Sequence, residues 1–258
     1  MIDLHCHVLP GIDDGPETMD ESIELARAAS AQGTTVLVAT PHVTYDHLDN
    51  TSERILAAVE DVNRTLRKQR VDVMVLPGAE VALERAGELE DDELAALRLG
   101  GGPWLLVECP MFAGGMGVDG QLHALASRGN RIVLAHPERC PVFQADLSLL
   151  SRLVEAGMLG QVTASALTGQ FGRTVERIAK DMVDRDLIQI AASDAHNAGR
   201  RPPVIRDHLE DAGFDGMADW MGLEVPEAVL AGTPIPYRPP ADRAPARKGL
   251  FGRRGRRG

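Results

Sequence analysis

The sequence predicts an α/β fold in which helices alternate with parallel strands, and it favours a barrel over an open sheet. Seven short, nearly continuous apolar runs occur along the chain, which is the pattern of strands buried on both faces of a parallel sheet. Helical periodicity separates most of these runs. The 258 residues are enough for one well-buried domain of barrel size. Seven strand–helix units therefore indicate a barrel, with an open sheet as the alternative.

The expected elements follow one another in regular order. The strands cover residues 2–4, 35–39, 71–76, 104–107, 131–135, 160–164 and 187–192. Apolar side chains recur with the spacing of one helix face in four segments, which are residues 17–32, 51–69, 147–156 and 174–185. The first helix has start signals in Asp14, Gly15 and Pro16. Gly33 supplies its stop signal.

The composition, 44% hydrophobic and 25% charged, is typical of a soluble globular protein. No apolar run approaches the roughly 20 residues that cross a bilayer, so the chain is not expected to span a membrane. The first residues lack the basic and apolar regions of a signal peptide, which favours the cytoplasm. Cys6, Cys109 and Cys140 show no paired spacing, as expected in a reducing compartment. Each lies beside a candidate site residue, where we expect it to pack, with redox sensing as the alternative.

The charge is unevenly distributed along the chain. From Arg238 onward there are eight Lys and Arg residues and one acid, which leaves 19 basic and 37 acidic residues, a net −18, for the rest. A body this acidic repels phosphate backbones, so nucleic-acid binding is not expected. We expect one folded domain at residues 1–236 and a basic, disordered tail at residues 237–258. The tail is either passive or in contact with an anionic surface.

Potential metal ligands occur where the expected strands end. His5 and His7 are two residues apart, so their side chains share one face of the first strand. Later strand ends supply His42, Glu80, Glu108, His136, Asp194 and His196. In a parallel barrel the C-terminal strand ends share one face, so these side chains are expected to meet. Burying several carboxylates without cations is costly, and we interpret the group as a site for divalent metals.

The donor types narrow the chemistry of this site. Imidazole and carboxylate donors without an obligatory thiolate suit Mn²⁺, Fe²⁺ or Zn²⁺. No cysteine pair has the spacing of a structural zinc site. The chain also lacks a Cys-x5-Arg loop, so a cysteinyl-phosphate route is not expected. His47, His123 and His208 lie away from the strand ends and are interpreted as ordinary surface residues.

Six segments carry a family resemblance. They are MIDLHCHVLPGIDDG at 1–15, ATPH at 39–42, LPGAE at 76–80, AHPER at 135–139, QVTASALTG at 161–169 and SDAHN at 193–197. In this order they resemble the PHP (polymerase and histidinol phosphatase) superfamily, and more closely its bacterial protein-tyrosine phosphatases associated with capsular and exopolysaccharide tyrosine kinases. The resemblance implies the PHP fold, a distorted (β/α)7 TIM-like barrel. Residues 43–47 depart from the His-His-x-x-Gly-x-Tyr form of many relatives, which affects substrate recognition and leaves His42 as a ligand.

The resemblance also implies site residues and cofactors. It implies two or three divalent metal ions, with Mn²⁺ as the first choice and Fe²⁺, Co²⁺ or Zn²⁺ as alternatives. The three ligand groups are His5, His7, Glu80 and Asp194; Glu80, Glu108 and His136; and Asp14, His42 and His196. Arg139 and Arg201 are implied to bind phosphate, with the adjacent Arg200 as the alternative to Arg201. Asp14 and His42 join these two arginines as implied catalytic residues.

The implied activity is metal-dependent hydrolysis of phosphotyrosine on a protein, with a membrane-associated tyrosine kinase that controls capsule or exopolysaccharide synthesis as the expected substrate. A water activated by the metals would attack phosphorus in line with the leaving group. The metals and Arg139 would stabilise charge on the phosphoryl oxygens. Two other functions stay open, namely a small-molecule phosphatase such as a histidinol phosphatase and a non-catalytic, metal-bound module that docks to a kinase.

Overall fold

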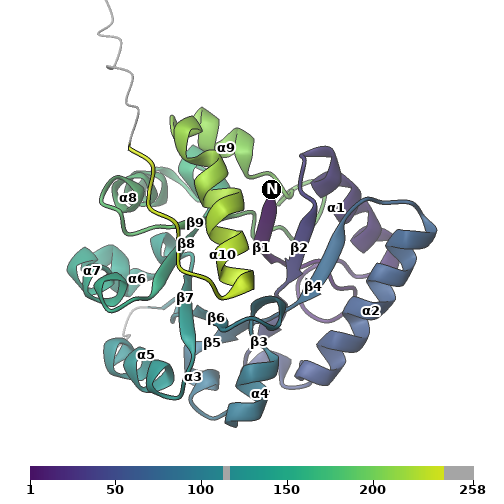
Figure 1. Ribbon diagram of the computed structural model, residues 1–258, viewed down its shortest axis with the longest axis horizontal. Helices are drawn as coiled ribbons and strands as arrows, with labels where there is room; N and C mark the ends of the chain where they lie inside the picture. Colours follow the sequence, from purple (N-terminus) through teal and green to yellow (C-terminus); the bar gives the residue numbers. More distant parts are fainter. Residues whose placement is uncertain (113–116, 241–258) are drawn as a thin grey trace, which may run out of the picture.

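Parallel strands form a barrel with helices around it in the computed structural model, which describes residues 1–112 and 117–240 (Figure 1). The strands are β1 (Ile2–Cys6), β2 (Val36–Ala39), β3 (His42–Val43), β4 (Met74–Pro77), β5 (Glu80–Ala82), β6 (Trp104–Glu108), β7 (Arg131–Ala135), β8 (Leu159–Thr163) and β9 (Ile190–Ala192). All seven expected strands are present. The third and the seventh begin three residues later than the apolar pattern predicts, at Met74 and Ile190.

The strands form two hydrogen-bonded sheets that together complete the barrel. One sheet has the order β1-β2-β4 and the other the order β3-β5-β6-β7-β8-β9, with every pair parallel. β3 follows β2 after two residues, as β5 follows β4, so the strands of the described residues occupy seven barrel positions. The circle closes between β9 and β1, where the Asp194 N–H donates to the His5 carbonyl at 2.9 Å. The predicted α/β barrel is confirmed.

Two barrel positions are interrupted, one between β2 and β3 and the next between β4 and β5, and the interruption has a local cause. Pro41 lies between β2 and β3 and Pro77 ends β4, and a proline has no N–H to donate to a strand ladder. Gly78 follows directly, and a Cβ at this position would lie 2.8 Å from the Val38 side chain. The chain resumes pairing at His42 and Glu80, which face each other in register. The interruption thus places these two side chains on adjacent strands at one end of the barrel.

Helices cover the outside of the barrel. They are α1 (Met19–Ala31), α2 (Ser52–Lys68), α3 (Leu83–Ala86), α4 (Asp91–Ala96), α5 (Val118–Ser127), α6 (Pro141–Ala145), α7 (Leu147–Glu155), α8 (Arg173–Asp184), α9 (Arg206–Asp211) and α10 (Val225–Ala231). The four expected helices are α1, α2, α7 and α8. The predicted start signal of α1 is wrong, because Thr18 caps the helix and forms a reciprocal capping box with Glu21. Gly33 follows the helix end with φ of 77°, as its stop signal predicts.

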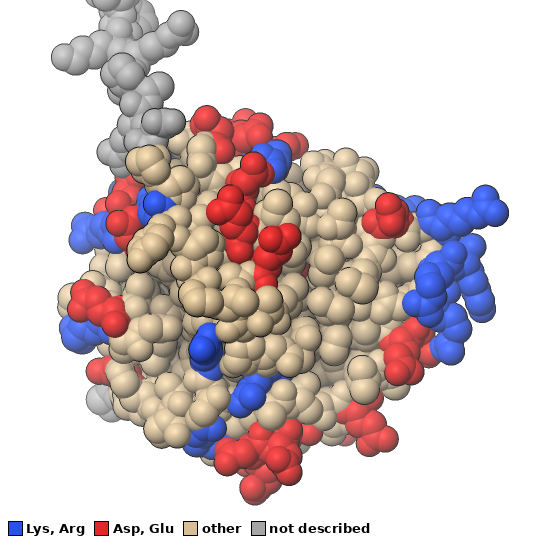
Figure 2. Space-filling model, viewed as in Figure 1, with Lys and Arg blue, Asp and Glu red and all other residues tan. Residues whose placement is uncertain are grey.

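Helix α10 closes the end of the barrel where the strands begin. Its Leu230 lies against Gly100 and Gly102, just before β6, and the helix also packs on β1. Figure 1 looks onto this end, with α10 in front. Figure 2, from the same side, shows acidic side chains over α10 within a mainly uncharged surface. The opposite end, where the strands finish, is therefore the open end of the barrel.

One glycine in β8 gives a stability prediction. A Cβ on Gly160 would lie 2.3 Å from the Leu187 carbonyl oxygen and 2.9 Å from Ile188 Cδ1, both in the chain that leads to β9. Gly160→Ala should therefore lower the free energy of unfolding by about 1–3 kcal/mol. Chemical denaturation measures this loss. Gly120→Ala is the control, since nothing lies within 4 Å of a Cβ in the exposed part of α5; it should be neutral or raise stability by up to about 1 kcal/mol.

The C-terminal segment leaves the barrel beside α8. Arg238 donates to the Val183 carbonyl at 2.8 Å and pairs with Asp186, so the first residues assigned to the basic tail contact the folded body. Residues 241–258, which carry most of that expected tail, lie outside the described residues. Within the part of the chain that the structure describes, no helix has both the length and the apolar character needed to cross a membrane.

Candidate metal centre

The structure brings all nine predicted ligand residues together at the open end of the barrel. Ligand atoms within 4.8 Å of one another form four overlapping groups, which are His7, Asp14, His42 and His196; His5, His7 and Glu80; His5, His136 and Asp194; and His42, Glu80 and Glu108. They come from the last residues of β1 and β6 or the loops after β1, β7 and β9, and from the first residues of β3 and β5, which resume the interrupted β2 and β4. Distant strand ends thus converge on a single cluster, as the barrel topology requires.

Glu80 lies at the centre of the cluster. Its Oε1 is 2.7 Å from His136 Nε2, and its Oε2 is 3.3 Å from His5 Nε2 and 3.1 Å from His42 Nδ1. Its side chain is 1% exposed. His7 Nε2 is also 3.4 Å from Oε2, so the two oxygens of one carboxylate face four imidazoles. This position would suit a residue shared between metal sites.

The strand β1 contributes two imidazoles to the interior of the cluster. His5 Nε2 and His7 Nε2 face each other at 3.3 Å. Asp194 Oδ1 lies 3.5 Å from each of them. All three residues are buried. Two imidazole nitrogens and a carboxylate oxygen thus face one another in the buried interior, an arrangement that could hold a cation.

The outer part of the cluster faces solvent. Asp14 Oδ1 is 3.1 Å from His196 Nε2 and 3.5 Å from His42 Nε2, and its side chain is 56% exposed. On the other side, Glu108 Oε1 is 3.6 Å from His136 Nε2. These partly open groups would leave room for a ligand to approach from solvent, whereas the interior groups would not.

The backbone is strained at two of these positions. His136 has φ of 30° and Asp194 has φ of 51°, in the left-handed region that residues other than glycine rarely adopt. His136 directly follows β7, and Asp194 lies two residues after the end of β9. Such a conformation costs about 1–3 kcal/mol and persists only when the surroundings enforce it. The strain turns both side chains inward, toward Glu80 and His5.

Hydrogen bonds around the cluster orient its imidazoles, and sequence reasoning missed the residues that make them. Asp13 Oδ2 is 2.7 Å from His7 Nδ1 and accepts the His42 N–H at 3.1 Å. Gln161, in β8, places Oε1 2.9 Å from His5 Nδ1. Each partner contacts the ring nitrogen opposite the one that faces the cluster, which fixes the tautomer of a ligating histidine. The adjacency of Asp13 to Asp14 was the available signal.

Strong mutual electrostatic effects shift the pKa values of the buried groups in the cluster. Burial alone would raise the pKa of Glu80, but His5 and His136 hold it well below its usual range. Burial alone would lower the pKa of His5, but Glu80 and Asp194 raise it. Among the described residues, Glu80 Oε2 and His42 Nδ1 have no hydrogen-bond partner of acceptable geometry despite their 3.1 Å separation. Buried carboxylate and imidazole atoms without hydrogen-bond partners, packed this closely together, fit a site that binds divalent metals.

The two predicted phosphate-binding arginines meet at the same carboxylate. Arg139 Nη1 is 2.6 Å and Arg201 Nη2 is 2.7 Å from Asp194 Oδ2. Both are only partly exposed, at 16% and 28%. The neighbouring Arg200 contributes its main-chain carbonyl, which accepts a hydrogen bond from Gln170. Arg201, rather than Arg200, therefore directs its guanidinium into the cluster.

The remaining sequence candidates lie around the site. Cys6, Cys109 and Cys140 are free and buried, and the Cys140 thiol lies 3.3 Å from the Pro110 carbonyl. His47 is half-buried and stacks beside His42, with ring centroids 5.9 Å apart. The other two histidines excluded from the site lie elsewhere: His123 is exposed on α5, and His208 is half-buried beside Thr168.

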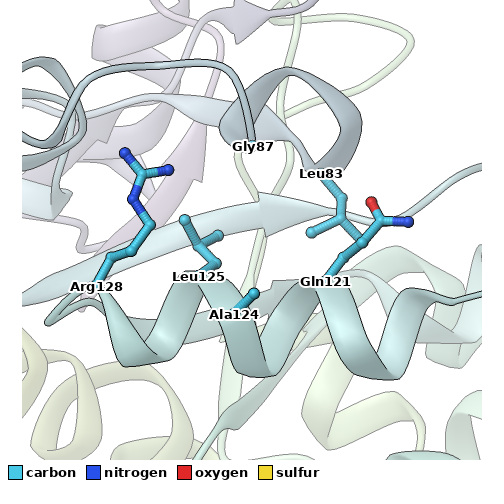
Figure 3. Close-up of a pocket in the computed structure, with 6 residues that line it drawn as sticks. All are labelled: Leu83, Gly87, Gln121, Ala124, Leu125 and Arg128. Atoms are coloured by element: carbon cyan, nitrogen blue, oxygen red, sulfur yellow. The ribbon is translucent and has the colours of Figure 1, made fainter.

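A small hollow between α3 and α5 is separate from this cluster (Figure 3). Gln121 lies toward one end and Arg128 at the other, with Leu125 between them. The Arg128 guanidinium is already engaged, since it pairs with Asp91 and donates to the Ala86 carbonyl. The residues that line the hollow include no imidazole or carboxylate. The hollow therefore offers no such metal ligand, and its one guanidinium is already paired.

Comparison with known proteins agrees with the geometry. Residues 1–212 match the family described as capsular polysaccharide synthesis, CpsB/CapC. The chain is 34% identical over 256 residues to the tyrosine-protein phosphatase YwqE of Bacillus subtilis (strain 168). The alignment covers 98% of this chain and 99% of YwqE. It is 26% identical over 213 residues to the tyrosine-protein phosphatase CpsB of Streptococcus pneumoniae, at 80% and 87% coverage.

A solved structure has the same fold. It comes from crystal structures of YwqE from Bacillus subtilis and CpsB from Streptococcus pneumoniae, described as unique metal-dependent tyrosine phosphatases. It superposes with a TM-score of 0.80 at 33% identity and covers 93% of this chain and 98% of the other. The resemblance predicted from the motifs is confirmed, and the chain belongs to the CpsB/CapC family of capsular polysaccharide synthesis.

Proposed function

We propose that this protein is a metal-dependent phosphatase that hydrolyses phosphotyrosine on a protein. The observation that carries the proposal is the convergence of nine His, Asp and Glu side chains with two arginines on one open barrel end. The His, Asp and Glu side chains would bind the cations. The paired guanidiniums supply the forked N–H groups that match phosphate oxygens. The relatives YwqE and CpsB, whose names describe tyrosine phosphatases, support the same reaction.

Two or three divalent ions, with Mn²⁺ as our first choice, would be held by the three ligand groups expected from the motifs. Bound divalent ions would supply a water of lowered pKa and neutralise charge on the phosphoryl oxygens. The chain contributes the rest. Asp13 and Gln161 hold His7 and His5 in the tautomer that presents Nε2 to the cluster. Burial keeps bulk water from the interior donors.

The arginines would bind and orient the phosphoryl group. Arg139 and Arg201 now contact one oxygen of Asp194, so an incoming phosphate would compete with that carboxylate for the same N–H groups. Arg139 follows β7 and Arg201 follows β9, the two strands on either side of β8. Phosphoryl transfer depends mainly on positioning and electrostatics, which two such groups provide. The exposed Asp14 and the half-buried His42 would assist the leaving phenol from the solvent-facing part of the cluster.

The substrate follows from the leaving group and the family. A phenol, with a pKa of about 10, leaves more readily than an alkyl alcohol and needs less help from a general acid. We therefore propose phosphotyrosine on a membrane-associated tyrosine kinase of capsule or exopolysaccharide synthesis. We assign catalysis to residues 1–236 and a role as a basic tail to residues 237–258.

Metal analysis coupled to a panel of phosphoesters tests this function. The protein, loaded in turn with Mn²⁺, Co²⁺, Fe²⁺ and Zn²⁺, should hydrolyse phosphotyrosine peptides and p-nitrophenyl phosphate. Preference for histidinol phosphate over the peptides would instead establish a small-molecule phosphatase. Metal retention without turnover of any phosphoester would indicate a docking module and overturn the proposal.

Asp13 gives a prediction for metal affinity. Asp13→Asn keeps the size of the side chain but weakens the charge-assisted contact with His7 Nδ1. Loss of such an outer partner lowers metal affinity by about 10–100-fold. Competition with a chelator of known affinity measures the change. Asp46→Asn, at an exposed position after β3, is the matched control and should bind metal like the wild type.

A further inference from the structure

The loop after β8 supplies no predicted ligand, yet it lies between the two loops that carry the arginines. β7, β8 and β9 are neighbours in the sheet, Arg139 follows β7 and Arg201 follows β9. After β8 the chain forms a short 3-10 helix (Ala164–Thr168) and then a turn at residues 169–172 before α8. This turn is placed to contact both neighbouring loops.

The turn has a defined shape. The Gly172 N–H donates to the Gly169 carbonyl at 2.9 Å, which makes Gln170 and Phe171 its two corner residues. Gly169 and Gly172 both have φ of 90°, a conformation that suits glycine. The Gln170 N–H donates to the Ser165 carbonyl at 3.2 Å, so the turn is fixed to the preceding 3-10 helix.

The first corner contact is with Arg139. The guanidinium carbon of Arg139 lies over the Phe171 ring, 4.8 Å from its centroid. Phe171 is half-buried and packs against the hydrophobic core, so its ring is held from behind. A guanidinium with one face on an aromatic ring keeps its in-plane N–H groups free for acceptors. One of them reaches Asp194 at 2.6 Å, the direction from which we expect phosphate.

The second corner contact is with the chain that carries Arg201. Gln170 Nε2 donates to the Arg200 carbonyl at 2.9 Å. On the other side of this segment, the Asn197 side-chain oxygen accepts the N–H groups of Arg200 at 2.6 Å and of Arg201 at 3.2 Å. Two side chains thereby hold the backbone at Arg200 and Arg201, and Gln170 reaches it from a different loop.

We propose that residues 169–172 position both phosphate-binding arginines, with Phe171 aligning Arg139 and Gln170 fixing the backbone of Arg201. The inference rests on the proposed function and deepens it. Held guanidiniums lose less conformational freedom when phosphate arrives, so phosphate binds more tightly. Phe171 and Gln170 act through the arginines and are positioning residues.

Affinity for inorganic phosphate, measured by calorimetry on the metal-loaded protein, tests the role of Phe171. Phe171→Leu keeps an apolar side chain but removes the ring, and should weaken phosphate binding about five- to tenfold. Phe171→Tyr and Phe171→Trp restore the ring face and should stay within about twofold of the wild type. Phe214→Leu, at another half-buried phenylalanine that lies outside the turn, is the matched control and should bind phosphate normally.

A double-mutant cycle separates positioning from a general structural role. In an Arg139→Ala background, Phe171→Leu should cause no further loss of phosphate affinity, because its partner is absent. An equal loss in both backgrounds, or no loss in either, would overturn the proposal. Loss for a phosphotyrosine peptide without loss for inorganic phosphate would also overturn it, since Phe171 would then contact the substrate ring. Phe171→Met replaces the leucine variant if the latter does not fold.

Gln170 has a parallel test. Gln170→Leu removes the donor to the Arg200 carbonyl at nearly constant volume and should weaken phosphate binding about threefold to tenfold. The effect should vanish in an Arg201→Ala background, and persistence there would contradict positioning. Gln121→Leu on α5 is the control. If the wild-type protein binds phosphate but cleaves no phosphotyrosine, only the proposed function is contradicted. The double-mutant cycles would still show whether residues 169–172 position the arginines.

Discussion

Glu80→Gln is expected to lower kcat/KM on a phosphotyrosine peptide by at least about a thousandfold, because several kcal/mol of charge stabilisation would depend on metals that we propose this carboxylate holds. Glu80 faces His136 with one oxygen and His5 and His42 with the other. An amide keeps the shape but replaces one anionic donor with an NH₂ group, which repels a cation. The variant should therefore lose both metal content and turnover, as measured by elemental analysis and steady-state kinetics.

Glu53→Gln makes the same chemical change on the exposed face of α2 and should retain full metal content and activity. The unfolding temperatures of the metal-free wild type and variants show whether a variant folds normally, so that a loss of metal binding can be distinguished from a loss of folding. A Glu80→Gln variant that folds, binds metal at wild-type stoichiometry and turns over normally would refute the central position assigned to this carboxylate.

Arg139→Ala is expected to lower kcat/KM by about a hundredfold to a thousandfold, the loss seen when one preorganised donor to a developing oxyanion is removed. KM should rise and kcat should fall together, because the guanidinium is proposed to contact the phosphoryl group in both the bound substrate and the transition state. Arg139→Lys keeps the charge without the fork and should recover only part of the loss. Steady-state kinetics on the peptide measures all three quantities.

Metal content distinguishes this effect from the previous one. Arg139 contacts Asp194 but supplies no metal donor, so Arg139→Ala should keep the metal that Glu80→Gln loses. Arg67→Ala, at an exposed position in the last turn of α2, is the control for removing a guanidinium. Unchanged kinetics in Arg139→Ala would show that phosphate binds elsewhere.

The parts of the fold that were predictable are those that bury long apolar runs. β6 and β7 carry five residues each and match the predicted strands to within one residue. β3 and β5 have two and three residues, too few to show a period, and exist because His42 and Glu80 pair in register. The start of α1 was readable from Thr18 and Glu21, but Asp14, Gly15 and Pro16 supplied a competing signal.

The site was predictable where function requires a residue at a strand end. Strand ends of a parallel barrel meet whatever their separation in sequence, which is why His5 and His136 could be grouped in advance. The supporting residues follow no such rule. Gln161 looks like any polar residue in a strand, and only the folded structure shows its oxygen against His5. Phe171 gave no signal at all, because an aromatic residue between glycines has no periodicity and its partner is 32 positions away in the chain.

The division of the barrel into two sheets has a consequence for what the ions would do mechanically. His5 and His7 belong to β1 and the loop after it, on the three-stranded side, whereas His42, Glu80 and His136 begin or follow strands of the six-stranded side. A cation bound between these groups would cross-link the two sheets of the barrel. Metal binding would then stabilise the protein against unfolding as well as make it catalytically active.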